Sequence, residues 1–412
     1  MKLLKIYINS FKGLSPESWM LALVMLINRS GSMVLPFLGV YMTDHLHFSL
    51  HNAGIVLSFF GIGSVVGSWL GGMITDKIGE FKVQSLALLL SVPMFCLIPV
   101  FKTEAGMAMI IFLQSSISEA FRPANSVAIT KYAKSGNITR AFSLNRMAVN
   151  LGFSIGPALG GILSAISYDF LFYTNALGAL LAGVTYVFFF RKRNYNNPEK
   201  PKNVTEPKAT SPYKDYPFII FCIICLVFSV CFFQILNTLT IFYKTEAKLS
   251  QQNIGYILGY SGFIIVLLEM LFVQIAEKYF SLKYTLFIGT LLCAVSFAML
   301  PLDTSVWFLI LSMTFICIGE IWTLPFMATV TALRSGTHNK GVYMGILGMA
   351  FSLSFIITPY LGTLIAEKSG FTILWIGTGI LLTLTAIAFY FVIPWMLGNK
   401  KDFNETELSE NL

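Results

Sequence analysis

Charged side chains are scarce in this chain of 412 residues: Asp, Glu, Lys and Arg make up 12% of it, whereas hydrophobic residues make up 56%. Roughly a quarter of the residues of a soluble globular protein are charged, so the composition excludes that class. The hydrophobic residues gather in runs long enough to cross a bilayer, which takes about 20 residues of helix. The sequence therefore predicts an all-α membrane protein that crosses the bilayer many times.

Sequence motifs of several enzyme and pump classes are missing as well. The chain has no HExxH pair and no glycine-rich loop of the kind that holds nucleotide phosphates. Cysteine is rare, and the CxxC at 222–225 lies in an apolar run without further metal ligands, which favours a role as small apolar filler. We therefore expect no metal, no cofactor and no nucleotide-driven pump. An intramembrane enzyme or a sensor on a transporter scaffold stays as a weaker alternative.

Twelve apolar runs of helical length follow one another along the chain. The links between most of them are short, so most neighbouring spans must run antiparallel. The predicted spans cover residues 17–43, 51–75, 82–101, 106–131, 140–166, 168–190, 217–243, 252–276, 283–300, 305–332, 340–366 and 371–396.

The formal net charge of +8 is distributed unevenly over the loops. When alternate loops are assigned to one side, most of the 28 Lys and Arg residues fall on that side, and the opposite loops hold only Lys102, Lys244, Lys248 and Lys368. Basic loop residues stay in the cytoplasm. We therefore expect both termini inside the cell, no removable signal peptide and no nucleic-acid partner.

A polar, proline-containing segment over residues 191–216 separates six spans from the next six. It divides the chain into an N-terminal bundle (1–190) and a C-terminal bundle (217–398), with a cytoplasmic tail over 399–412. The two bundles repeat each other in sequence. At an offset of 201 residues, Asp76 falls on Glu277 and Glu119 falls on Glu320.

Two duplicated six-span halves joined by a cytoplasmic linker resemble the major facilitator superfamily. The most specific element is "GGMITDKIGEFK", in which Gly72, Asp76, Lys77 and Gly79 match the family pattern G-x-x-x-D-[RK]-x-G-[RK]-[RK]. Glu80 departs from it, because a basic residue is usual there. The resemblance implies twelve transmembrane helices in two pseudo-repeated six-helix bundles, alternating access, and a monomer in the cell inner (plasma) membrane.

The charged corners at the ends of the second and eighth spans predict a gate. An acid at such a corner can accept hydrogen bonds from a helix N-terminus in the other half, and the adjacent lysine can pair with acids there. We expect Asp76 with Lys77, and Glu277 with Lys278, to latch the halves together on the cytoplasmic side. The alternative is that these charges only set the topology.

Two glycine patterns indicate close helix packing. Gly63, Gly67 and Gly71 form a stripe along the second span, on which another helix could slide or simply pack. The fifth span contains "GFSIGPALGG", which resembles a signature of drug/proton antiporters. That resemblance implies export and a bent, tightly packed helix that seals the cavity. The matching residues are Gly152, Gly156, Pro157, Gly160 and Gly161.

Six ionisable residues lie well inside the predicted spans, where each costs at least about 2.5–3.5 kcal/mol if it faces lipid. We expect them to line a central cavity or to pair with one another. Glu119 and Arg122 are three residues apart, so they share a helix face. Glu320 has no arginine within a turn of its own helix, which makes it the preferred proton carrier, with Glu119 and Glu269 as further candidates. Fixed structural ion pairs are the alternative.

Arg29 belongs to a partial resemblance between the first span and the proton-coupled oligopeptide transporters, whose pattern is E-x-x-E-R. Met25 and Asn28 replace the two acids of that pattern, so only the arginine remains, as a clamp for an anionic group. Polar and aromatic residues of other spans complete the expected cavity. The predicted substrate-binding residues are Arg29, Arg122, Arg146, Asn28, Asn150, Gln234 and Trp322.

These features together predict a secondary transporter in the lipid bilayer that exchanges protons for a small organic or amphipathic solute, in the manner of multidrug efflux. Proton-coupled uptake of a peptide-like or anionic metabolite is the alternative, prompted by the arginines inside the spans.

Overall fold

The structure is a computed structural model that describes Tyr7 and residues 9–31, 34–134, 136–195, 211–236, 238–335 and 339–397. Within these ranges all regular elements are helical. The α-helices are α2 (Pro16–Ser30), α3 (Val34–Val40), α4 (Leu50–Ile78), α5 (Glu80–Leu97), α6 (Glu104–Tyr132), α7 (Ile138–Ile166), α8 (Asp169–Tyr195), α9 (Tyr216–Phe232), α10 (Thr238–Thr245), α11 (Gln251–Tyr279), α12 (Leu282–Met299), α13 (Val306–Ile321), α14 (Leu324–Arg334) and α15 (Lys340–Leu397).

The helices make twelve membrane-length passes, which confirms the predicted fold class. Three passes consist of two helices in line: α2 with α3, α9 with α10, and α13 with α14. Helix α15 makes two passes, because the chain turns at Gly370, whose φ of 84° favours glycine. Among the described residues, eight helical segments are long and apolar enough to cross a membrane, and α15, α9 with α10, and α13 with α14 each count as one of these.

Several helices begin at residues that the sequence marks as N-caps. The hydroxyl oxygens of Ser15, Ser49, Thr103 and Ser250 each accept a hydrogen bond from the backbone N–H three residues further on. These bonds satisfy amide groups that a helix N-terminus leaves without a partner. Capping therefore fixes where α2, α4, α6 and α11 start.

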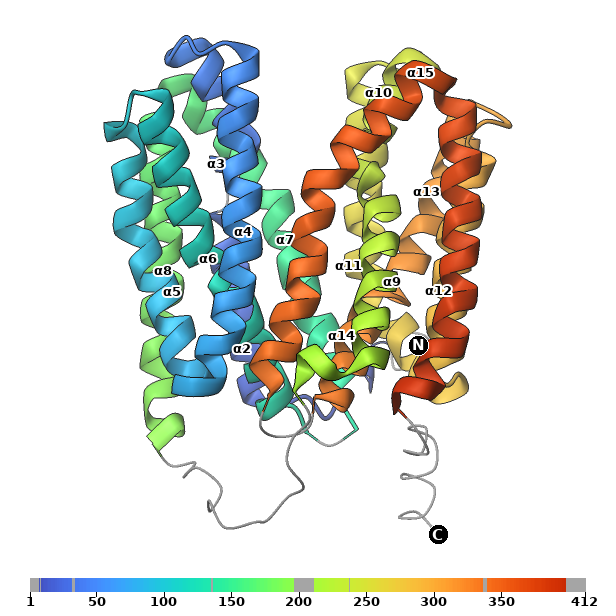
Figure 1. Cartoon of the computed structure of the whole chain (residues 1–412), viewed down its shortest axis with the longest axis horizontal. Helices are drawn as coiled ribbons and strands as arrows, with labels where there is room; N and C mark the ends of the chain where they lie inside the picture. Colours follow the sequence, from blue (N-terminus) through green and yellow to red (C-terminus); the bar gives the residue numbers. More distant parts are fainter. Residues whose placement is uncertain are drawn as a thin grey trace.

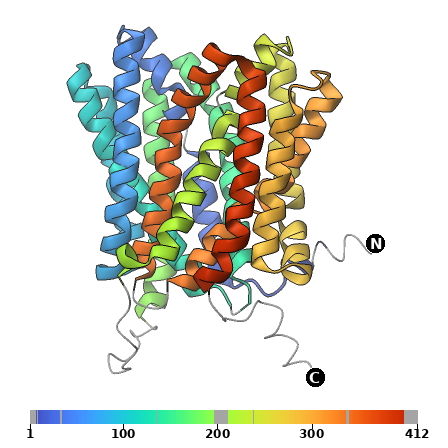
Figure 2. The same ribbon diagram turned by 45° about the vertical axis from the view of Figure 1, so that its right-hand side comes forward.

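The helices form two groups, α2 to α8 and α9 to α15, which stand next to each other (Figure 1). The passes run roughly along one common axis and span a similar height (Figure 2). The linker side is the membrane face at which α8 ends and α9 begins, drawn at the bottom of Figure 1. The ribbons of α4 and the first pass of α15 approach each other toward the linker side and diverge toward the opposite side.

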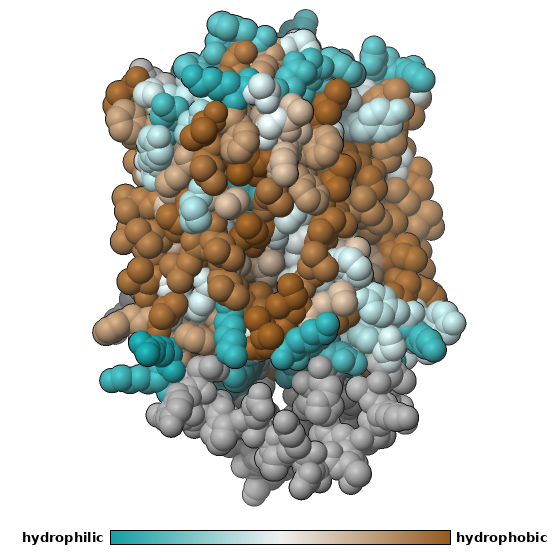
Figure 3. All heavy atoms as spheres, turned by 60° about the vertical axis from the view of Figure 1, so that its left-hand side comes forward, coloured by the Kyte–Doolittle hydropathy of each residue, from teal (hydrophilic) through white to brown (hydrophobic). Residues whose placement is uncertain are grey.

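The outer surface has a broad apolar belt between two polar rims (Figure 3). Large apolar residues on the helices are exposed, among them Phe188 of α8 at 87% and Trp307 of α13 at 82% exposure. A soluble monomer does not expose apolar surface on this scale. The belt is therefore the surface that faces lipid.

Each group of helices has its own apolar core. The second group is built around one large cluster that includes Phe221, Phe297 and Trp375. A core cluster of the first group also takes in Met270 and Met344, which belong to the second group. The two halves are therefore in direct apolar contact, in addition to the polar contacts that follow.

Candidate functional site

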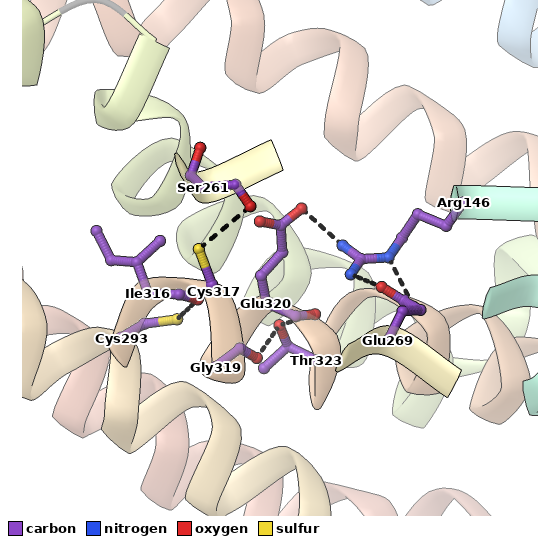
Figure 4. A network of polar contacts seen from close by, with 9 residues as sticks. All are labelled: Arg146, Ser261, Glu269, Cys293, Ile316, Cys317, Gly319, Glu320 and Thr323. Atoms are coloured by element: carbon purple, nitrogen blue, oxygen red, sulfur yellow. Dashed lines mark hydrogen bonds and ion pairs between the residues drawn. The ribbon is translucent and has the colours of Figure 1, made fainter. Parts of the chain in front are cut away.

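The main polar contact between the halves is an ion-paired cluster around Arg146 of α7, called here the acidic cluster (Figure 4). Its Nε lies 3.1 Å from Glu269 Oε1, and its Nη2 contacts Glu269 Oε2. Its Nη1 lies 2.6 Å from Glu320 Oε1. Arg146 comes from the first half, whereas Glu269 of α11 and Glu320 of α13 come from the second. One guanidinium thus binds two carboxylates across the boundary between the halves.

A helix break holds Glu320 in this position. Helix α13 ends one residue after Glu320, and the chain resumes as α14 at Leu324. The Thr323 hydroxyl donates to the carbonyl oxygens of Gly319 (2.9 Å) and Glu320 (3.3 Å), and the Thr323 backbone N–H donates to the Glu320 carbonyl oxygen at 3.2 Å. Gly319 lets α13 lie against α12, because a Cβ there would sit 2.6 Å from the carbonyl oxygen of Gly289. Close packing and the break together present the carboxylate to α7.

The sequence did not reveal the partner of Glu320. The expectation that its own helix offers no arginine holds, but Arg146 of the other half occupies its carboxylate. Nothing in the local sequence could show this, because the two residues are 174 positions apart. The six ionisable residues inside the predicted spans are three acids and three arginines, and these equal numbers were the available signal for pairing.

A second group of ionisable residues, called here the basic cluster, lies within the first half. Arg122 Nη2 is 2.8 Å from Glu119 Oε2, the contact that their spacing along α6 predicts. Arg29 of α2 interacts electrostatically with both. Its guanidinium carbon lies 5.6 Å from the ring centre of Phe153. Within the described residues, no carboxylate lies at ion-pair distance from Arg29, and its buried Nε makes no hydrogen bond.

The other predicted substrate-binding residues occupy different surroundings. Asn150 lies one turn after Arg146 on α7, with a buried Nδ2 that has no partner in the described part of the chain. Asn28 is half-buried beside Arg29. The Gln234 Oε1 accepts a hydrogen bond from the Thr238 hydroxyl at 2.5 Å, so Gln234 belongs to the packing of the second half.

Trp322 also serves packing in this structure. Its indole N–H donates to the carbonyl oxygen of Phe272 at 3.0 Å, and its ring lies against Phe272 and Phe280. A tryptophan held in this way has its polar atom satisfied by α11 rather than by a solute. Its expected role in the cavity has no support from this geometry.

The first charged corner joins α4 to the start of α15. Asp76 Oδ1 accepts a hydrogen bond from the backbone N–H of Gly341 (2.6 Å), and Oδ2 accepts one from Val342 (2.8 Å). A carboxylate at a helix N-terminus also meets the positive end of the helix dipole. Gly72 permits the approach, because a Cβ there would lie 2.4 Å from the Gly341 carbonyl oxygen. Gly79 ends α4 with a φ of 85°.

The second charged corner is built differently. Glu277 Oε2 accepts a hydrogen bond from Nε of Arg140 on α7 at 2.7 Å, again across the halves. The lysines of the two corners, Lys77 and Lys278, are exposed. Within the part of the chain that the structure describes, neither forms an ion pair, so the expected pairing of these lysines is absent in this state. The gating role of both corners stays a prediction.

Glu80, which departs from the family pattern, is buried against the first half. Its Oε1 lies 2.6 Å from the Nζ of Lys131 on α6. This contact explains how an acid is accommodated at a position where a basic residue is usual.

The glycine stripe packs within the first half. A Cβ at Gly63, Gly67 or Gly71 would come within 2.5 Å of α6 atoms, so these residues fit α4 tightly against α6. Static packing is therefore the interpretation that the structure favours. Gly72, one position further along the helix, faces the other half instead.

In the fifth span, α7 continues as one helix through the antiporter-like signature. Gly152 fits against the backbone of α2, because a Cβ there would lie 2.6 Å from Arg29 Cβ. Gly156 and Gly160 are buried. The surroundings of Pro157 and Gly161 fall outside the described part of the structure, so the predicted bend and seal stay predictions.

Comparison with known protein families identifies the family of this chain. The family description "Major Facilitator Superfamily" matches residues 20–281 and 242–408. The chain therefore belongs to this superfamily, whose members are transporters and not enzymes.

Individual relatives agree with this assignment. The chain is 25% identical over 393 residues to the "Uncharacterized MFS-type transporter YttB" of Bacillus subtilis. This alignment covers 93% of this chain and 97% of that protein. It is 24% identical over 252 residues to the "Quinolone resistance protein NorA" of Staphylococcus aureus, with 60% and 64% covered. The crystal structure of the human organic anion transporter MFSD10 has the same fold, with a TM-score of 0.71 at 14% identity over 91% of this chain and 99% of that one. A small-molecule substrate and a place in the plasma membrane follow from the family and its bacterial members.

Proposed function

We propose that this protein exports a small organic or amphipathic solute in exchange for protons by alternating access. The observation that carries the proposal is the acidic cluster, in which Arg146 of one half binds Glu269 and Glu320 of the other. The name of the quinolone resistance relative supports export of an organic solute. The basic residues of the linker side support a cytoplasmic position for that face.

The contacts between the halves hold the linker side closed. Asp76 joins α4 to α15, and Arg140 joins α7 to Glu277. Nearer the middle of α4, the Ser64 hydroxyl lies 2.8 Å from that of Ser352 on α15. Opening the linker side has to separate these helices, and with them α7 from α11 and α13.

Separation removes Arg146 from the two carboxylates. Breaking a buried pair by removing one partner costs about 3–5 kcal/mol, because a buried charge is left without compensation. Protons that bind the carboxylates remove this cost. Proton binding from the opposite side therefore favours opening of the linker side, where the solute enters as the protons leave.

Within the acidic cluster, Glu320 is the preferred first acceptor of a proton. It keeps 8% of its surface exposed, whereas Glu269 has none. The Glu320 carboxylate is also less constrained, since Arg146 holds Glu269 through two contacts and Glu320 through one.

The direction of transport decides between this proposal and proton-coupled uptake. The uptake alternative is favoured by Arg29, whose positive charge suits an anionic metabolite. The test uses everted vesicles with a preformed proton gradient and a fluoroquinolone as the probe. Export by exchange predicts that the probe dissipates the gradient and accumulates inside the vesicles. Probe accumulation in right-side-out vesicles on an inward proton gradient would instead show uptake.

A further inference from the structure

The two charged clusters carry opposite charge excess. The basic cluster has Arg29 and Arg122 against Glu119, and the acidic cluster has Glu269 and Glu320 against Arg146. Protons can neutralise the excess of the acidic cluster, as proposed above. The excess positive charge of the basic cluster has no counterpart among the described residues within ion-pair distance of Arg29.

Arg29 is the member of the basic cluster that has no ion-pair partner among the described residues. Arg122 is paired with Glu119 at 2.8 Å, whereas the buried Nε of Arg29 donates to no acceptor in the described part of the chain. The Arg29 guanidinium carbon lies 5.6 Å from the centre of the Phe153 ring, and this cation–π contact offsets part of its positive charge. A buried guanidinium normally has its donors satisfied by a carboxylate or by hydrogen bonds. Its planar donors match a carboxylate in particular.

A second donor without a partner lies on the adjoining helix. Asn150 Nδ2 is buried and makes no hydrogen bond to any described residue. Asn150 and Phe153 are three residues apart on α7, hence on one face, and the guanidinium of Arg29 lies over Phe153. Arg146 is one turn from Asn150 on the same face. Arg146, Asn150 and Phe153 therefore lie along one face of α7, and roughly 10 Å of helix separates Arg146 in the acidic cluster from Phe153 beside Arg29.

Gly152 allows α7 to pack closely against α2 at Arg29. Its missing side chain lets α7 approach the backbone of Arg29, because a Cβ there would lie 2.6 Å from Arg29 Cβ and 3.0 Å from its carbonyl carbon. The glycine of the antiporter-like signature therefore holds the arginine against the helix that carries Asn150 and Phe153.

We propose that Arg29 and the Asn150 amide bind a carboxylate of the transported solute, with the body of the solute along α7 over Phe153. The substrate class is an organic acid or zwitterion with an apolar body. This inference rests on the proposed function only in that a solute enters between the halves; it is independent of direction and of proton coupling.

The test measures equilibrium binding to the purified full-length protein without any gradient. The probes are three matched pairs, each an aromatic acid and its methyl ester: benzoic acid, 4-phenylbutyric acid and a fluoroquinolone. We expect at least one acid to bind about tenfold more tightly than its ester. Arg29→Gln should abolish that preference and Arg29→Lys should keep part of it. Asn150→Ala should weaken it without a change in the helical fold.

Arg193→Gln is the matched control, because Arg193 pairs with Glu17 and stacks on Phe189 away from both clusters. It should leave the acid preference unchanged. Equal binding of acid and ester in all three pairs, including no binding of either, would overturn the proposal. A preference that survives in both Arg29→Gln and Asn150→Ala would do the same. Glu320→Gln should keep the preference while it loses proton coupling, so failure of the proposed function can be told apart from failure of this inference.

Discussion

Glu119 and Glu320 occupy equivalent positions in the two halves, yet their partners differ. Glu119 pairs with Arg122 on its own helix, and the pair moves as one body however the halves rotate. Glu320 pairs with Arg146 of the opposite half, so its contact exists only while the two halves are close. Duplication has thus placed one acid in a pair within its own half and the other in a pair between the halves, and we propose that protonation of the second acid is linked to movement.

The largest effect should come from exchanging the two acids for amides in turn. Glu320→Gln removes a titratable group whose ion pair crosses the halves, and we expect about a 100-fold loss of proton-coupled transport, in line with about 3 kcal/mol for a buried pair. Glu119→Gln should cost about tenfold or less. Proton flux into reconstituted liposomes on addition of the fluoroquinolone measures both. Equal losses in the two variants would break the comparison.

The next effect concerns the linker-side corner that binds a helix N-terminus. Asp76→Asn keeps one acceptor but loses the charge that holds two backbone N–H groups, and such charge-assisted bonds contribute about 1.5–3 kcal/mol. Turnover should fall about tenfold while probe affinity changes little. Glu17→Gln, at a surface ion pair, serves as the control. Wild-type turnover in Asp76→Asn would leave this corner a topological signal only.

The smallest effect on transport is expected at an ion pair that lies wholly within the second half. Asp215 caps α9 and binds Arg334 at 2.7 Å and the Tyr343 hydroxyl at 2.6 Å. Burial alone would raise the pKa of Asp215, but these hydrogen bonds and the Arg334 charge hold that pKa below its ordinary value.

The stabilising effect of the Asp215 carboxylate should therefore be complete above its unfolded pKa of about 3.9 and should be lost as the pH falls through the lower folded value. Asp215→Asn should lower the melting temperature by a few degrees at pH 7 and leave the ratio of protons to solute unchanged. A changed ratio would show that this static pair also takes part in coupling. Melting curves and vesicle assays on one preparation give both quantities.

Much of the architecture could be predicted from the sequence, because membrane spans and the Glu119 to Arg122 pair depend on local spacing. The break between α13 and α14 has a local signal in Pro325, in the first turn of α14, because proline cannot donate the backbone hydrogen bond of a continuous helix. The packing of Trp322 and Thr323 against Gly289 depends on the fold and could not be predicted. The sequence also did not show which neighbouring helix the glycine stripe packs against. A rotation of one residue about the helix axis separates Gly71, which packs on α6, from Gly72, which packs on α15.

The candidate site was predictable in its residue types but not in its pairs. Six ionisable residues within the predicted spans stood out against an apolar background, because an ionisable residue that faces lipid is costly. Which of them meet depends on how the halves dock, and no sequence spacing encodes the contact of Arg146 with Glu269 and Glu320. The donor atoms left without a partner on Arg29 and Asn150 are visible only in the folded chain.

The most direct test of proton-linked opening is a distance measured between the linker-side ends of α4 and α11. Spin labels at Ile78→Cys and Tyr279→Cys, both at exposed positions, report that distance by pulsed electron resonance on a background without the native cysteines. We predict a longer distance as the pH is lowered in the otherwise unchanged protein, and a long distance at every pH once Glu269→Gln and Glu320→Gln are added. A pH response that persists unchanged in the doubly substituted protein would contradict the account.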